Sequence, residues 1–262
     1  MPAVTPSEPT PFDDGALYDA IMGSLDYGLD FYLRLARATT GPVLDVACGT
    51  GRILLPCLQA GVDVDGLDLF PGMIAQLKKK AAALGLRPSV FEADMRSFRL
   101  GRRYALIMIP FNAFVHCLTT EEQIAALVCC REHLLPGGML AFDTFFSGPA
   151  IIIATDNTRV LELETTHPET GAPLRVYDAR SFDRVAQIQD SQMEIEVLDP
   201  AGNVTATHRS RTAIRWIYKG EMELLLRVAG FDRWKISGGF DGRPLEKETD
   251  SLIVQAFTAA AN

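Results

Sequence analysis

The chain has 262 residues, of which 48% are hydrophobic and 22% are charged, and its formal net charge is −8. This composition is ordinary for a globular protein, and the length allows one α/β domain with an insertion. The acidic balance disfavours nucleic acid as a partner, because affinity for a phosphate backbone needs a basic surface. No apolar stretch approaches the length that spans a bilayer, so we expect no membrane partner.

The five cysteines are odd in number and lack metal-ligand spacing, which favours reduced thiols in a cytoplasmic protein without a metal site. The first ten residues are rich in proline and contain no Lys or Arg, unlike a signal peptide. We therefore expect a disordered tail over residues 1–14.

The first predicted strand is the apolar run Val43–Val46, which leads into the glycine-punctuated turn Ala47–Arg52 and then a helical pattern. This order places a tight loop at the carboxyl end of a buried strand, where open α/β sheets bind nucleotide-like ligands. Gly49 and Gly51 let the backbone approach a ligand that a Cβ would push away. A dinucleotide fingerprint needs a third small residue where Leu54 stands, which argues against a nicotinamide or flavin cofactor.

Strands and helices continue to alternate along the chain. The pattern predicts strands at 62–68, 88–91, 106–109 and 139–142, with helices beginning at Pro71 and at a capping box over Thr120–Gln123. Residues 221–231 read as a late helix, followed by an antiparallel pair of strands at 234–237 and 252–257.

Residues 147–218 interrupt this rhythm. Leu161–Glu164 and Met193–Val197 alternate apolar and charged residues, and a turn at 199–203 precedes a return strand over 204–218. These features predict an inserted antiparallel β-sheet next to the ligand cleft, which serves as an acceptor lid or as a homodimer surface.

The run from Asp45 to Arg52 (D-V-A-C-G-T-G-R) resembles motif I of the class I S-adenosylmethionine (SAM) dependent methyltransferases, and Leu134–Gly138 resembles their L-x-P-G-G turn. The resemblance implies an α/β fold with a Rossmann-like, mostly parallel sheet whose last strand is antiparallel. It assigns residues 15–146 and 219–262 to the SAM-binding domain. SAM is the implied cofactor.

In that family, an acid placed like Asp68 binds both ribose hydroxyls, and one placed like Asp94 binds the adenine amino group. The cofactor-binding residues that the resemblance implies are Tyr18, Tyr32, Asp45, Ala47, Gly49, Thr50, Gly51, Arg52, Asp68, Leu69, Met73, Asp94, Met95, Arg96, Ile109 and Phe111.

Methyl transfer from a sulfonium needs a positioned nucleophile, a dry site and, for a protonated acceptor, a base. His116 follows the fourth strand and could be that base; its alternative is a loop histidine bonded to backbone or cofactor. Tyr18 could bind the methionine moiety or orient an amine, with simple helix packing as the alternative. Tyr27 and Tyr32 compete for similar roles.

Three residues are candidates for contact with the acceptor. Asn112 could bind the acceptor or be a turn residue, and Phe145 could line an apolar pocket or pack in the core. Arg215 on the return strand could meet an anionic substrate or pair with a carboxylate.

Within the superfamily, residues 93–102 and the early Tyr18–Asp19 pair resemble small-molecule N-methyltransferases that act on amino sugars of nucleotide-linked precursors. The 111–115 loop and Phe145–Phe146 depart from that pattern. We therefore expect methyl transfer to the N or O of a small-molecule acceptor. A non-catalytic SAM-binding scaffold and a protein or peptide methyltransferase are the alternatives.

Overall fold

The computed structural model describes residues 9–260 except 24, 146–151, 154 and 168–169. The main sheet comprises β1 (Val43–Val46), β2 (Val64–Asp68), β3 (Ser89–Glu92), β4 (Tyr104–Ile109), β5 (Leu134–Thr144), β10 (Arg233–Ser237) and β11 (Leu252–Phe257). Their order is β10-β11-β5-β4-β1-β2-β3. β11 runs antiparallel to both of its neighbours, whereas every other pair is parallel, so the predicted Rossmann-like sheet is confirmed.

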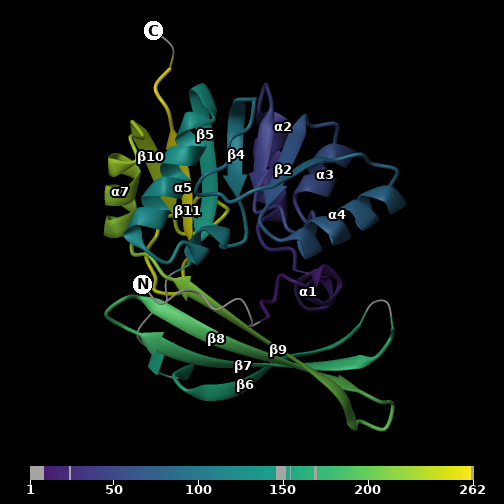
Figure 1. Ribbon diagram of the computed structural model, residues 1–262. Coiled ribbons are helices and arrows are strands. Elements are labelled where there is room, and N and C mark those ends of the chain that lie inside the picture. The colour runs from purple at the N-terminus through teal and green to yellow at the C-terminus, as the bar shows by residue number, and fades with distance from the viewer. Residues whose placement is uncertain (1–8, 24, 146–151, 154, 168–169, 261–262) are drawn as a thin grey trace.

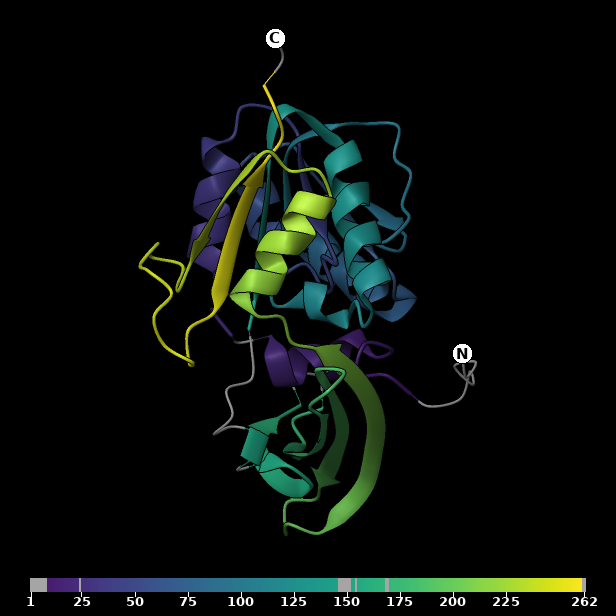
Figure 2. The ribbon, with the colours of Figure 1, turned by 90° about the vertical axis from the view of Figure 1, so that its left-hand side faces the viewer.

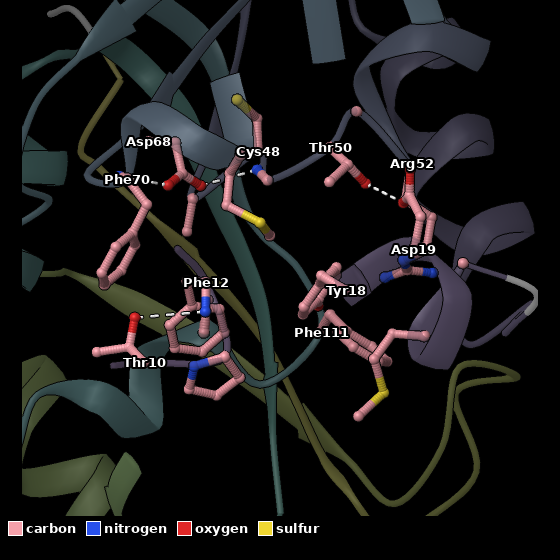
Figure 3. A pocket seen from close by; sticks show the side chains of 18 of the residues that line it. Thr10, Phe12, Tyr18, Asp19, Cys48, Thr50, Arg52, Asp68, Phe70 and Phe111 are labelled. Atoms are coloured by element: carbon pink, nitrogen blue, oxygen red, sulfur yellow. Dashed lines mark hydrogen bonds between the residues drawn. The ribbon is translucent and has the colours of Figure 1, made fainter. Parts of the chain in front are cut away.

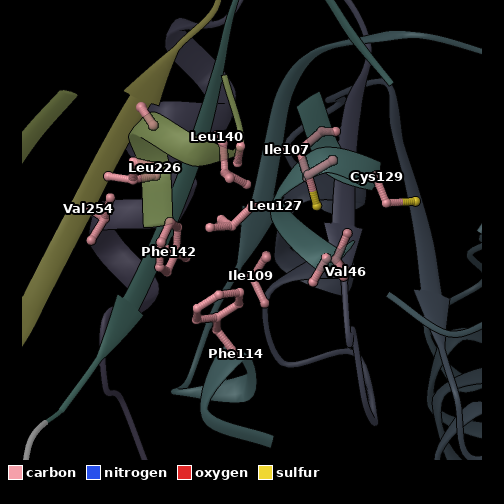
Figure 4. Close-up of a cluster of buried hydrophobic side chains, with 14 of the residues drawn as sticks. Val46, Ile107, Ile109, Phe114, Leu127, Cys129, Leu140, Phe142, Leu226 and Val254 are labelled. Atoms are coloured by element: carbon pink, nitrogen blue, oxygen red, sulfur yellow. The ribbon is translucent and has the colours of Figure 1, made fainter. Parts of the chain in front are cut away.

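Helices cover both faces of this sheet (Figure 1). One face carries α5 (Thr120–Glu132) and α7 (Lys219–Val228), and the other carries α2 (Leu29–Ala38), α3 (Leu54–Gln59) and α4 (Pro71–Ala83). The central strands are buried on both sides, which is why their sequences read as continuous apolar runs. Figure 4 shows Ile109 and Phe142 of the sheet facing Leu127 of α5.

Helix α5 begins one residue earlier than the sequence predicts. The Thr119 hydroxyl accepts a hydrogen bond from the Glu122 N–H, and the Glu122 carboxylate accepts one from the Thr119 N–H. The capping box therefore spans Thr119–Glu122 rather than Thr120–Gln123, because the N-cap residue lies outside the helix that it closes. Among the described residues, none of the helices combines the length and apolar character needed to cross a membrane.

A second sheet is formed by β6 (Thr158–Thr166), β7 (Pro173–Asp183), β8 (Ile188–Leu198) and β9 (Val204–Arg215), all antiparallel to their neighbours. The sequence did not identify β7, because the buried polar residue Asp178 interrupts its apolar alternation. β9 ends at Arg215 and not at 218, since Trp216 and Ile217 turn into the buried interior.

Helix α1 (Gly15–Met22) lies between the main domain and the second sheet (Figures 1 and 2). Ile21 packs against Leu174, Val176 and Ile195 of that sheet, whereas Asp19 forms an ion pair with Lys80 of α4 at 3.0 Å. α1 therefore covers the apolar face of the inserted sheet and joins it to the main domain.

Residues 9–14 differ from the expected disordered tail. The Asp14 carboxylate caps α1 by accepting the Ala16 and Leu17 N–H groups at 3.0 Å, and Phe12 packs against Phe70. Local capping and aromatic contacts order this stretch. Residues 1–8 of the expected tail, residues 147–151 of the expected insertion and Phe146 lie outside the described residues.

Candidate active site

A cavity of about 1350 Å³ extends from the carboxyl ends of β1 and β2 to α1 and β9. Figure 3 shows side chains from the main domain and from the α1 region facing this space. Ligand pockets typically measure roughly 300–1,000 Å³, so the cavity has room for a cofactor and a second reactant. Such a site fits a reaction between two bound molecules.

The glycine-rich loop after β1 forms the base of the cavity. Gly49 and Gly51 adopt φ angles of 55° and 88°, which L-residues with side chains rarely adopt. A Cβ on Gly51 would lie 2.8 Å from Cγ of Leu55, so the turn and the packing of α3 both require glycine there. The loop ends at the start of α3, and its residues line the cavity.

Asp45 carries the strongest sign that this cavity receives a cation. Both of its carboxylate oxygens are buried without a well-formed hydrogen bond among the described residues, and the side chain lines the cavity. Burial raises the pKa of Asp45 to about 7, while the charge of Arg52 and the Leu54 N–H lower it only in part. A buried carboxylate without a full set of partners fits the positively charged methionine end of SAM.

Asp68 at the end of β2 stands where the ribose is expected. Its Oδ2 accepts the Gly49 N–H at 2.8 Å and its Oδ1 accepts the Phe70 N–H at 2.9 Å. These bonds fix the carboxylate, and each oxygen keeps a further lone pair for a hydroxyl group. Burial raises the pKa of Asp68, and the backbone N–H groups act in the opposite direction. The geometry fits a diol ligand.

Asp94 and Arg96 form a closed ion pair at the expected adenine end. The Arg96 guanidinium donates to both Asp94 oxygens and also reaches Glu122 of α5. The hydrogen bond from Arg96 holds the pKa of Asp94 below its ordinary value, so this carboxylate stays ionised. The pair ties the cavity wall to the capping box of α5.

A carboxylate that the sequence reasoning missed shapes the opposite wall. Asp143 at the end of β5 is fully buried and accepts the Phe111 and Asn112 N–H groups at 2.9 Å and the Tyr32 hydroxyl at 2.5 Å. Phe111 and Asn112 have φ angles of 60° and 58°, a strained conformation that these bonds stabilise. Phe111 in turn lies 4.5 Å from the Arg52 guanidinium. An acid at the carboxyl end of a parallel strand was the signal available in the sequence.

His116 lines the cavity from the short helix η1 (Ala113–His116). Burial lowers the pKa of His116, and a hydrogen bond to the Ala213 backbone raises it in part. The neutral imidazole that burial favours is the form that can accept a proton. Tyr18 also lines the cavity, and burial raises the pKa of Tyr18 to about 12. Its hydroxyl can donate a hydrogen bond but does not act as a base near neutral pH.

Most of the predicted site residues line this one cavity, and six do not. Those that line it are Tyr18, Asp45, Ala47, Gly49, Thr50, Gly51, Arg52, Asp68, Leu69, Met73, Asp94, Met95, Arg96, Phe111 and His116. Those that lie elsewhere are Tyr27, Tyr32, Ile109, Asn112, Phe145 and Arg215.

Arg215 has a different set of contacts from the one expected of a substrate ligand. Its guanidinium pairs with Glu221 of α7 at 2.6 Å and donates to the Thr120 hydroxyl of α5 at 3.1 Å. The side chain therefore joins the end of β9 to two helices of the main domain. Tyr32 and Asn112 act on the cavity wall through Asp143.

The sequence also missed two groups of lining residues. Strands β8 and β9 contribute Met193, Ile195 and residues 207–213, and residues 9–14 enter from the N-terminal side. The position of the insertion after the fifth strand predicted that the sheet as a whole lies next to the cleft, but nothing in the local patterns singles out these individual residues.

Comparison with known proteins places the chain among methyltransferases. The family described as "Methyltransferase domain" matches residues 43–138. The chain is 30% identical over 214 residues to the dTDP-3-amino-3,4,6-trideoxy-alpha-D-glucopyranose N,N-dimethyltransferase of Streptomyces venezuelae, covering 78% of this chain and 80% of that protein. It is 26% identical over 253 residues to the cypemycin N-terminal methyltransferase of a Streptomyces species, covering 95% and 98% of the two chains.

A solved structure extends the similarity to almost the whole chain. The CcbJ methyltransferase from Streptomyces caelestis superposes with a TM-score of 0.76 and 26% sequence identity, covering 97% of this chain and 100% of that one. Only 3% of this chain lies outside the superposition, which is far less than residues 158–215. The inserted sheet is therefore part of the fold that the two proteins share.

Proposed function

Because this chain belongs to the class I SAM-dependent methyltransferases and has SAM as its cofactor, we propose that it methylates an amine nitrogen of a small-molecule acceptor. The observation that carries this proposal is a cavity that continues from the cofactor loop to His116 and the inserted sheet. A SAM-binding scaffold without transfer would need no such second compartment. The relative from S. venezuelae, an N,N-dimethyltransferase, supports nitrogen over oxygen.

We assign the cofactor to the part of the cavity built by the main domain. Asp68 would hold the ribose hydroxyls, Leu69 and Met95 would flank the adenine, and Asp45 with Arg52 would hold the methionine end. SAM supplies a methyl group that its sulfonium already activates. The chain itself has to hold the acceptor lone pair in line with that methyl group and exclude water.

His116 is our candidate for the base that takes a proton from an ammonium acceptor. Its lowered pKa keeps the imidazole neutral near pH 7, which is the form that a base requires. Tyr18 remains protonated and would orient the acceptor or the methionine group as a donor. The position of His116 and Tyr18 on the same cavity wall supports both of these proposed roles.

The inserted sheet is proposed as the acceptor-side lid. Met193 and Ile195 line the cavity, and Ile21 of α1 packs on the same apolar cluster. An apolar wall of this kind excludes water from the reacting atoms. A homodimer, with the outer face or edges of this sheet as the contact, remains a further proposal. So does a cytoplasmic location, which the five buried free cysteines support.

Incubation with SAM carrying a labelled methyl group and with fractions of cell extract tests the proposed function. We expect label in small amines, with S-adenosylhomocysteine as the second product. Asp68→Ala is the matched control, since it removes the proposed ribose contact. Label in macromolecules only, or no transfer by a protein that binds SAM, would contradict the proposal.

A further inference from the structure

Residues 9–13 line the cavity and contact both β9 of the inserted sheet and α4 of the main domain. The Pro9 carbonyl accepts a hydrogen bond from the Arg211 N–H of β9 at 3.0 Å. At the other end, Asp13 lies so close to α4 that a Cβ on Gly72 would come within 2.1 Å of its carbonyl oxygen. This segment thus touches both walls of the acceptor side.

Phe12, in the middle of the segment, projects into the cavity. Its ring centroid lies 5.2 Å from that of His116 in an edge-on contact, 5.0 Å from Phe70 and 6.0 Å from Tyr18. Figure 3 shows the Phe12 side chain between Phe70 and Tyr18. The ring therefore contacts both candidate catalytic side chains and Phe70, whose N–H donates to the proposed ribose ligand Asp68.

A base must come within hydrogen-bond reach, about 2.6–3.2 Å, of the atom from which it takes a proton. The space in contact with the His116 ring is the space that this atom has to enter, and the Phe12 ring now fills part of it. We propose that Phe12 stands in the place of the acceptor and that an acceptor displaces it to reach His116. This inference rests on the proposed function and makes Phe12 a specificity-determining residue.

The contacts of the segment allow such a displacement without disturbing α1. The Phe12 ring contacts and the bond from the Arg211 N–H to the Pro9 carbonyl hold its inward end, and the Thr10 and Phe12 N–H groups bond within the segment itself. The Asp14 carboxylate caps α1 independently, through the Ala16 and Leu17 N–H groups. Residues 9–12 can therefore move about the anchored Asp13 and Asp14 while the helix that joins the two sheets stays in place.

The displacement also explains selectivity. An acceptor that replaces the ring regains the lost apolar and aromatic contacts only if it carries a group of similar shape. A flat ring or compact apolar group next to the amine meets this requirement against Phe70 and Tyr18. A small, fully hydrated amine does not, so it would leave Phe12 in place.

The rate at which diethyl pyrocarbonate modifies His116 tests the proposed position of Phe12 directly. The folded protein is modified first and then digested, and mass spectrometry of the peptides measures the modification of each histidine. In Phe12→Ala we expect His116 to react several-fold faster than in the wild type, because the ring no longer shields it. Phe12→Leu, which keeps an apolar side chain, should react at close to the wild-type rate. His133 is the internal reference, since it is buried against Phe98 away from the cavity and should not change.

A second arm asks whether the vacated place admits a ligand. Toluene added to Phe12→Ala should slow the modification of His116 again, because a space vacated by an aromatic ring between Phe70 and Tyr18 can take another small aromatic ring. The same addition should have no effect on the wild type. S-adenosylhomocysteine binding by each variant confirms that the cofactor site is folded.

Equal rates at His116 in Phe12→Ala and the wild type would overturn the proposal, as would a failure of toluene to protect the variant. Neither arm needs methyl transfer. The modification rates can therefore contradict the role of Phe12 while the proposed function still holds. Conversely, a failure to find an acceptor would not change these rates.

Discussion

The Tyr32 hydroxyl donates a hydrogen bond of 2.5 Å to the Asp143 carboxylate, which links α2 to the end of β5 inside the main domain. The same carboxylate holds the Phe111 and Asn112 N–H groups in a left-handed turn. One buried acid thus fixes the wall of the cofactor cavity from behind, without lining the cavity itself. The partners of Asp143 lie far from it in the sequence, and we expect removal of its carboxylate to weaken binding at the cofactor site.

Tyr32→Phe deletes one hydrogen bond to a buried carboxylate and keeps the ring. We expect the free energy of unfolding to fall by about 1.5–3 kcal/mol, the usual contribution of a hydrogen bond to a charged group. Asp143→Ala should cost more, because it leaves two backbone N–H groups without their acceptor, and it should also weaken S-adenosylhomocysteine binding. Urea denaturation measures the first effect and calorimetry the second. A Tyr32→Phe protein as stable as the wild type would rule out this role for the bond.

Asp68→Ala should weaken SAM binding by about 1.5–3 kcal/mol, because a charge-assisted pair of hydrogen bonds to the ribose is lost. Isothermal titration calorimetry measures this. Asp63→Ala is the control, since Asp63 is an exposed acid of the same region that does not line the cavity. Unchanged SAM affinity in Asp68→Ala would show that the ribose binds elsewhere.

Asp45 should make stability depend on pH in the absence of cofactor. Burial raises its pKa from 3.8 to about 7. Between these two pH values, the folded protein retains a proton that the unfolded chain has lost. The stabilisation from this group is complete below the unfolded value and disappears as the pH rises through about 7.

Asp45→Asn removes this titration. We expect the variant to gain stability relative to the wild type as the pH rises from about 4 to about 7, measured by urea denaturation. SAM affinity of the wild type should rise over the same range, because the ionised carboxylate attracts the cationic methionine end. If the stability difference between the two proteins does not change with pH, the pKa of Asp45 is not raised in the folded protein.

His116→Ala should lower the rate of methyl transfer while SAM affinity stays nearly intact. The defect should shrink at high pH, where an amine acceptor is already deprotonated and needs no base. Rates measured across a pH series, with SAM affinity measured in parallel, give the test. If SAM binding and turnover fall together, His116 is a cofactor ligand instead.

Ile195→Asp places a charge in the apolar cluster between the inserted sheet and Ile21 of α1. We expect this change to abolish methyl transfer and to leave S-adenosylhomocysteine binding measurable, because the cofactor residues belong to the main domain. Thr205→Asp, at an exposed position of β9, is the matched control. Full activity in Ile195→Asp would mean that the sheet is not the acceptor-side lid.

The sequence by itself determined the features that depend on neighbours in the chain. The strand, loop and helix from Val43 onward lie in one continuous stretch, so the run from Asp45 to Arg52 predicted both the local backbone and the kind of ligand. The carboxyl ends of parallel strands meet at one edge of a sheet, and for that reason Asp68 and Asp94 could be placed beside the loop in advance.

Only the tertiary structure decided which distant residues complete the cavity. Asp143 meets the Phe111 turn because β5 lies beside β4 in the sheet, and their contact spans 32 positions of the chain. Phe12 meets His116 because α1 packs between two sheets, and Arg215 is drawn away from the cavity by Glu221. Such pairings depend on the packing of whole elements, which local sequence patterns do not encode.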